Sequence, residues 1–108
     1  MSKPNLVMAL YKAKPGKDSE LRGLIKEHFP LLKQYGLTTD RVPFIAQSSN
    51  GTYLEVFEWK NAAAAKSAHD HPAIAKIWEA MGMICSFEKL ENLPEISKPF
   101  PHFEQVEV

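Results

Sequence analysis

The first part of the chain carries a strand pattern followed by a helix pattern. Residues 5–13 form a short, mostly apolar run, which predicts a central strand. Pro15 and Gly16 end this strand, because proline and glycine both interrupt a β-ladder. Pro30 falls within the helix pattern that follows and removes a backbone hydrogen bond, so we expect a kink or a second short helix there. The stripe of this helix has apolar spacings of three and four and comprises Leu21, Leu24, Ile25, His28, Phe29 and Leu32.

Asn50-Gly51 separates two further strand patterns, at residues 42–49 and 52–59. Asn-Gly between strands favours a two-residue type I′ turn, because both central residues of that turn need a positive φ. Such a turn pairs Ala46 with Glu55 and Phe44 with Phe57. Since side chains alternate across a strand, one face then carries Phe44, Ala46, Ser48, Tyr53, Glu55, Phe57 and Trp59. We expect the helices to cover the opposite face, which carries Ile45, Gln47, Leu54, Val56 and Glu58.

The next segment predicts a helix that a proline interrupts. Asn61 precedes a run of alanines, which are strong helix formers, and is placed to cap their helix. Pro72 is compatible with a new helical segment that begins there, with Asp70 or His71 as its cap. We expect this helix to end at Gly82.

Residues 83–91 predict a fourth strand, and an extended arm follows it. Pro94, Pro99 and Pro101 stiffen the arm, and residues 103–108 alternate like a short strand. The arm therefore carries both stiff and apolar segments.

The order of elements is βαββαβ plus the arm. This order predicts an α+β, ferredoxin-like fold, an antiparallel four-stranded sheet with both helices on one face. We expect a domain over residues 1–93 and an arm over residues 94–108 that packs on the partner subunit. The predicted aromatic face is too apolar to lie in water, so a second copy is expected to cover it. The resulting homodimer would close an α+β barrel, and small Ala46 opposite Glu55 leaves room in it for a cavity.

Composition narrows the class of protein. The chain has 108 residues, of which 44% are hydrophobic, and this suits one globular domain. Its 13 Lys and Arg balance its 13 Asp and Glu, which argues against nucleic-acid and anionic-membrane partners, since both need a basic surplus. The single cysteine, Cys85, rules out an internal disulfide and fits a reducing compartment. With no signal-peptide pattern and no apolar run near the roughly 18 residues of a membrane helix, we expect a cytoplasmic protein.

Three segments carry a family resemblance: KPGK at residues 14–17, EVFEWK at residues 55–60, and AHDHP at residues 68–72 followed by Trp78. Together with the order of elements, they resemble the dimeric α+β barrel superfamily and, within it, small proteins of the antibiotic-biosynthesis-monooxygenase type. The resemblance implies cofactor-free oxidation of aromatic phenols, haem degradation or a small isomerase reaction. Haem-degrading members carry a ligand histidine late in the second helix, where this chain has Trp78 and Met81. We therefore expect no cofactor.

Two residues are candidate catalytic groups, each with an alternative interpretation. Glu55 in an aromatic wall would be disfavoured in its charged form and could act as a general base. It could equally be a carboxylate paired with a Lys or Arg across the dimer. His69 could move a proton near neutral pH or could only form a cap or hydrogen bond beside Pro72. His28 is interpreted as a semi-buried histidine that is already hydrogen-bonded.

Aromatic residues are the candidate walls of a binding cavity for a small apolar or aromatic molecule: Phe44, Tyr53, Phe57 and Trp78. Trp78 can instead be a core or interface anchor. His69 and His71 would point to opposed faces of a helix, so no metal site is expected. Two functions stay open. One is a cofactor-independent monooxygenase or isomerase acting on a small phenolic molecule, and the other is a non-catalytic ligand-binding or structural dimer.

Overall fold

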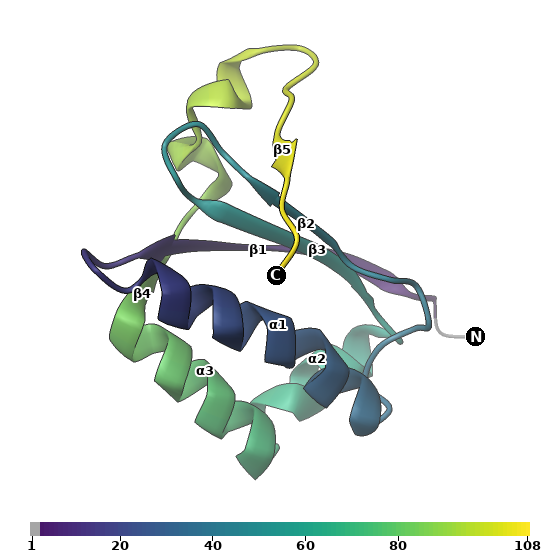
Figure 1. The fold of residues 1–108 in the computed structure, drawn as a ribbon. Coiled ribbons are helices and arrows are strands. Elements are labelled where there is room, and N and C mark those ends of the chain that lie inside the picture. The colour runs from purple at the N-terminus through teal and green to yellow at the C-terminus, as the bar shows by residue number, and fades with distance from the viewer. Residues whose placement is uncertain (1–2) are drawn as a thin grey trace.

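The computed structural model describes residues 3–108, which form an α+β fold with one five-stranded antiparallel sheet. The strands are β1 (Asn5–Ala13), β2 (Phe44–Gln47), β3 (Tyr53–Trp59), β4 (Cys85–Phe87) and β5 (Glu104–Gln105), in the order β4-β1-β3-β2-β5. Three α-helices, α1 (Asp18–Gln34), α2 (Ala62–His69) and α3 (Pro72–Ile84), lie together on one side of the sheet (Figure 1). The sheet has one strand more than the predicted four, because the arm supplies β5.

The helices form where the sequence predicts them, and their ends follow local chemistry. Asn61 caps α2 by accepting a 2.8 Å hydrogen bond from the backbone N–H of Ala64. His71 caps α3 through Nδ1, which accepts from the backbone N–H of Ala73 at 3.2 Å. No second helix begins at Pro30, since α1 continues through this exposed position, where water can satisfy the carbonyl that proline leaves free. Gly82 does not end α3, because the buried apolar stripe of the helix continues to Ile84.

The β2–β3 hairpin differs from its predicted register by one residue. The backbone N–H of Ser48 donates to the carbonyl of Thr52 at 2.8 Å, and that of Gly51 donates to the carbonyl of Ser48 at 3.0 Å. Gly51 has a φ of 91°, and no non-glycine residue among those described has a positive φ, which excludes the type I′ turn. The loop of residues 49–51 is instead of the kind in which a turn is followed by one left-handed glycine. It pairs Ala46 with Leu54 and places Glu55 opposite Ile45.

This shift moves every β3 side chain to the other face of the sheet from the one predicted. Tyr53 packs with α1 and α3 in one buried cluster, and Phe57 and Trp59 pack with α1, α2 and α3 in another. The aromatic face thus lies beneath the helices of its own chain. The aromatic residues of β3 therefore need no second copy to cover them, contrary to the prediction, and the prediction that Leu54 and Val56 face the helices is wrong as well.

The opposite, outer face of the sheet is covered only at one end. There Leu93 and Phe103, which follow β4, pack on Leu10 and Leu54. The other end leaves three large apolar side chains in solvent: Leu6 is 69%, Met8 42% and Phe44 74% exposed. We call these three side chains the outer apolar patch.

The arm returns to the sheet of its own chain, where the sequence predicted contact with a partner subunit. After two short 3-10 turns, Leu90–Asn92 and Pro94–Ser97, it forms β5 on the free edge of β2 (Figure 1). Backbone groups on an uncovered strand edge need partners, and β5 supplies them to β2. Glu95 fastens the arm to the hairpin, since its carboxylate accepts from Ser48 Oγ at 2.7 Å and from the Ser49 backbone N–H at 2.8 Å.

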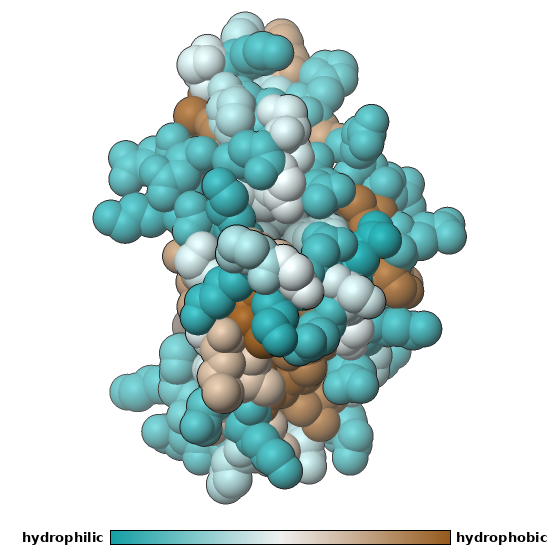
Figure 2. Space-filling model, turned by 60° about the vertical axis from the view of Figure 1, so that its left-hand side comes forward, coloured by the Kyte–Doolittle hydropathy of each residue, from teal (hydrophilic) through white to brown (hydrophobic). Residues whose placement is uncertain are grey.

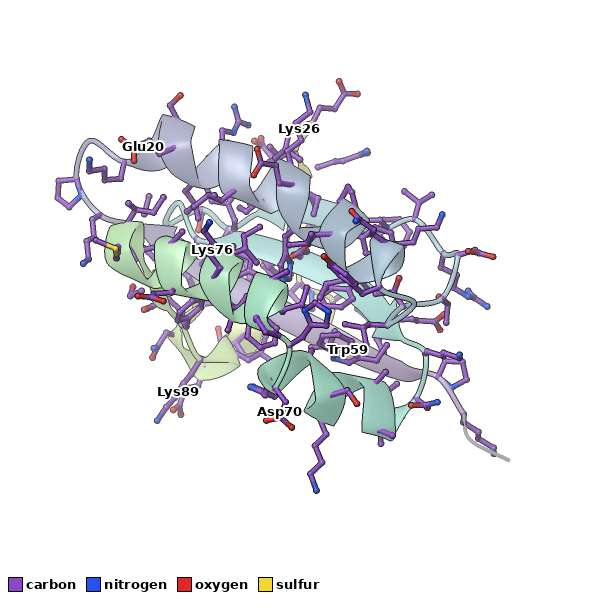
Figure 3. All side chains as sticks on the ribbon, turned by 90° about the horizontal axis from the view of Figure 1, so that it is seen from below. Glu20, Lys26, Trp59, Asp70, Lys76 and Lys89 are labelled. Atoms are coloured by element: carbon purple, nitrogen blue, oxygen red, sulfur yellow. The ribbon has the colours of Figure 1, made fainter. Side chains whose placement is uncertain are left out.

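The visible surface in Figure 2 is mostly hydrophilic, with apolar side chains in patches between polar ones. Charged side chains such as Lys26 and Lys76 project from the outer surfaces of α1 and α3 (Figure 3). Within residues 3–108, no helix combines the length and the apolar character that crossing a membrane requires.

Replacing Gly51 by alanine tests the hairpin. A Cβ at Gly51 meets no atom within 4 Å, so the cost comes from the left-handed backbone alone. We expect Gly51→Ala to lower the free energy of unfolding by about 1–2 kcal/mol. Gly23→Ala is the matched control, because its Cβ also meets open space but lies within α1, and it should stabilise the protein by roughly 0.5–1 kcal/mol. Urea unfolding measures both, and a neutral Gly51→Ala would contradict the turn described.

The Glu95 contact predicts a pH dependence. The backbone hydrogen bond from Ser49 and the side-chain bond from Ser48 lower the pKa of Glu95 from 4.5 to about 2. A lowered pKa stabilises the fold above about pH 4.5, and this contribution is lost as the pH falls through 2. Urea midpoints measured from pH 6 to 2 should therefore fall more steeply in the wild type than in Glu95→Gln. The exposed Glu104→Gln is the control and should follow the wild type, whereas a Glu95→Gln curve parallel to the wild type would refute the contact.

Candidate active site

A cavity of about 380 Å³ lies between the sheet and the helices. Its aromatic and histidine walls come from β1, α1, β3, α2, α3 and β4 and comprise Tyr11, His28, Phe57, Trp59, His69, Trp78 and Phe87. In the view from the helix side, Trp59 lies close to the junction of α2 and α3, where Asp70 marks the turn (Figure 3). A single chain thus forms this open cavity, whereas the sequence predicted one between the sheets of two chains.

Glu55 lies at the centre of a buried polar cluster beside this cavity. Its side chain is fully buried, and Oε1 accepts a 2.7 Å hydrogen bond from the Tyr11 hydroxyl. The same oxygen lies 2.8 Å from Nδ1 of His28. On the other side of the imidazole, Nε1–H of Trp78 donates to Nε2 of His28 at 2.8 Å. The four side chains come from β1, α1, β3 and α3, so the cluster ties the helices to the sheet. We call it the Glu55 cluster.

The donors and acceptors in the Glu55 cluster fix the tautomer of His28. An indole N–H can only donate, so Nε2 of His28 must be the acceptor and carries no proton. The imidazole proton is then on Nδ1 and points at the carboxylate of Glu55. The imidazole is thus oriented by a carboxylate, as a general base can be, and its basic lone pair on Nε2 accepts from Trp78. His28 is one of the residues that line the cavity.

Burial and the charge of Glu55 both raise the pKa of Tyr11. Desolvation is the largest cause, followed by the charge and the hydrogen bond of Glu55, and together they raise the pKa of Tyr11 far above its usual range. The hydroxyl therefore stays protonated and donates to the carboxylate. The second oxygen, Oε2, is buried and has no hydrogen-bond partner among residues 3–108. Tyr11 and His28 thus carry the stabilisation of this buried carboxylate.

The two candidate catalytic residues occupy different positions. Glu55 lies in the cluster, and its hydrogen bonds run to His28 and Tyr11 of the same chain, so pairing with a cation across a dimer does not describe it. His69 is exposed at the cavity wall, and its ring centre lies 4.9 Å from that of Trp78. The structure therefore separates His69 from the carboxylate and places His28 beside it.

Of the four candidate wall residues, two line the cavity and two lie elsewhere. Phe57 and Trp78 line the cavity. Tyr53 is buried in the neighbouring core cluster, and its hydroxyl donates to Oδ1 of Asp18 at 2.6 Å. Phe44 lies on the face away from the helices, as predicted, but the register shift moves the β3 aromatic residues to the helix side and so separates Phe44 from this cavity.

The prediction that His28 is a hydrogen-bonded histidine is confirmed, but the sequence did not indicate its partners, nor that Tyr11 belongs to the site. His28 fits the apolar stripe of α1, so the pattern indicated a structural residue and gave no sign of its carboxylate partner. Tyr11 lies in the first strand, and only the β1–β3 pairing, in which Ala9 opposes Glu55 and Tyr11 opposes Tyr53, brings it near Glu55. Tyr11, His28 and Glu55 are each a polar side chain within an otherwise apolar pattern. This shared feature is the signal from which a contact between them could have been predicted.

Within residues 3–108, no group of three or more His, Cys, Asp or Glu side chains is arranged to hold a metal ion. No protein-family model and no curated protein matches the chain. The chemistry of the site must therefore be inferred from its own residues.

Removing one hydroxyl tests the charge on Glu55. We expect Tyr11→Phe to lower the free energy of unfolding by about 2 kcal/mol, because the lost hydrogen bond serves a buried carboxylate. Tyr53→Phe is the matched control, since its hydroxyl serves the exposed Asp18, and it should cost less than about 1 kcal/mol. Urea unfolding at pH 7 compares them. If Tyr11→Phe lowered the free energy of unfolding no more than Tyr53→Phe does, the hydrogen bond from Tyr11 would not be stabilising a buried anion at Glu55.

Proposed function

We propose that this protein is a cofactor-independent enzyme that removes a proton from a small phenolic molecule bound in the cavity, and that it is a monooxygenase of the antibiotic-biosynthesis-monooxygenase type. The observation that carries the proposal is the buried Glu55–His28 pair, because His28 is one of the residues that line an aromatic cavity. A cavity of this size suits a small aromatic ligand. An isomerase of the same substrate class would use the same base and return the proton to another carbon.

His28 is the proposed base, and Glu55 is the group that supports it. Nε2 takes the proton, and the imidazolium that forms is stabilised by the adjacent carboxylate. Phe57 and Trp78 hold the aromatic rings of the substrate in place. Removal of the proton leaves an electron-rich anion that reacts with molecular oxygen as co-substrate. For a methylene group between two rings, one oxygen atom becomes the new carbonyl and the other leaves in water with the two methylene hydrogens.

Incubation with anthrone-like phenols under oxygen, followed by absorbance of the quinone, tests this function. His28→Gln should lower the rate by about 10²–10⁴-fold, because a general base contributes roughly this factor. Its amide can still bond to Glu55 and Trp78, so the fold is preserved. Glu55→Gln should also lower the rate, whereas His69→Ala should change it only a few-fold, because His69 lies at the cavity wall away from Glu55. Full activity in a folded His28→Gln variant would refute the base.

One observation favours the second candidate, a non-catalytic binding protein. Both ring nitrogens of His28 already have partners, Glu55 and Trp78, so the cluster is complete without a ligand. A purely structural cluster would have this property. Binding of aromatic molecules without turnover on a broad panel of phenols would favour this alternative.

We further propose that two copies of the chain associate through the outer faces of their sheets. The support is the outer apolar patch of Leu6, Met8 and Phe44, which the arm leaves uncovered. Two such faces packed together would bury these side chains and close a barrel. The free, buried Cys85 fits the reducing environment of the cytoplasm, which is the proposed location.

Sedimentation velocity at micromolar concentration tests the dimer. We expect the wild type to sediment as a dimer and Phe44→Asp as a folded monomer, because a charge in the patch cannot be buried between two sheets. Met83→Asp is the matched control, since Met83 is 71% exposed but lies on α3, and it should remain dimeric. A monomeric wild type would contradict the proposal.

A further inference from the structure

The Trp78–His28 hydrogen bond occupies the lone pair that the proposed base needs. Nε1 of Trp78 and Nε2 of His28 are 2.8 Å apart, and both side chains line the cavity. A ligand that uses Nε2 must therefore open this bond. The polar group of the ligand would then lie between the N–H donor of Trp78 and the unprotonated Nε2 of His28.

We propose that the ligand of this cavity is an aromatic molecule with a hydroxyl group that inserts between Trp78 and His28, which makes Trp78 a specificity-determining residue. The inserted oxygen accepts from Nε1–H of Trp78, and its proton is donated to Nε2 of His28. A hydroxyl satisfies both groups at once. An ether can only accept, and so leaves Nε2 unpaired, and a carboxylate anion would in addition approach the charge of Glu55.

The surroundings of Trp78 allow the bond to open. Two hydrogen bonds that meet at one oxygen need the two nitrogens to separate by roughly 2 Å. His28 cannot supply this movement, because it is 2% exposed and held by Glu55. Trp78 is only half-buried, and its neighbour on the cavity side is the exposed ring of His69. Trp78 also packs against both core clusters, so the opening requires only a small shift of its indole toward the exposed His69 ring, while the imidazole keeps its place.

This inference rests on the proposed ligand cavity but not on turnover, so binding tests it separately. Isotope-labelled full-length protein is titrated with 1-naphthol and, as a matched ring without the acidic proton, 1-methoxynaphthalene. We expect 1-naphthol to bind about tenfold more tightly, because it makes one more hydrogen bond. The indole N–H resonance of Trp78 should shift with 1-naphthol far more than with the ether. The indole resonance of Trp59, which lines the same cavity, should respond similarly to both ligands.

The variant His28→Phe tests whether His28 is the residue that makes the cavity prefer a hydroxyl group. In His28→Phe, both ligands can only accept from Trp78, so the tenfold preference should disappear. If this variant does not fold, the wild-type resonances of Trp78 and Trp59 still decide the matter. Equal affinities in the wild type, an unmoved Trp78 resonance, or no binding of either ligand would overturn the inference. Selective binding of 1-naphthol without oxidation of any phenol would support it while contradicting the proposed monooxygenase.

Discussion

The buried carboxylate of Glu55 is the constraint on which the rest of the site depends. A charge with no exposure must be compensated by nearby donors, and here the Tyr11 hydroxyl and His28 supply them on a single oxygen. Those two donors come from β1 and α1, and Trp78 of α3 completes the cluster. The same contacts therefore fix how the helices sit on the sheet, and they direct Nδ1 of His28 to Glu55 and Nε2 to Trp78. A hydrophobic residue at position 55 could fill the space, but it would not orient the imidazole.

The hairpin decides which side of the sheet receives this carboxylate. With the left-handed glycine at position 51, Glu55 and the aromatic residues of β3 turn toward the helices. The cavity then forms within one chain, and in the proposed dimer a second copy would cover a different surface from the one that the sequence predicted. It would cover Leu6, Met8 and Phe44 on the outer face, while the arm already protects the other end of that face.

Local signals in the sequence predicted much of the fold, and long-range pairing explains most of what they missed. The period of the apolar residues located β1 and α1, and Asn61 and Pro72 located the helix starts, because capping and proline chemistry act within a few residues. The hairpin register was wrong because Asn50-Gly51 suits more than one loop, and the choice between them inverts a face. His28 was predicted to be hydrogen-bonded, but its partner was not identified, since Glu55 is 27 positions away. The pairing of β5 with β2 was missed for the same reason.

A crystal structure with 1-naphthol bound would test the central claim most directly. The account predicts the ring in the cavity beside Phe57, the hydroxyl oxygen about 3 Å from Nε2 of His28, and the indole nitrogen of Trp78 moved away from that nitrogen. The bond between His28 and Glu55 should remain unchanged. Naphthol bound elsewhere on the protein, with the Trp78–His28 bond intact and the cavity closed by side chains, would contradict the account and leave the Glu55 cluster as a structural element of the core.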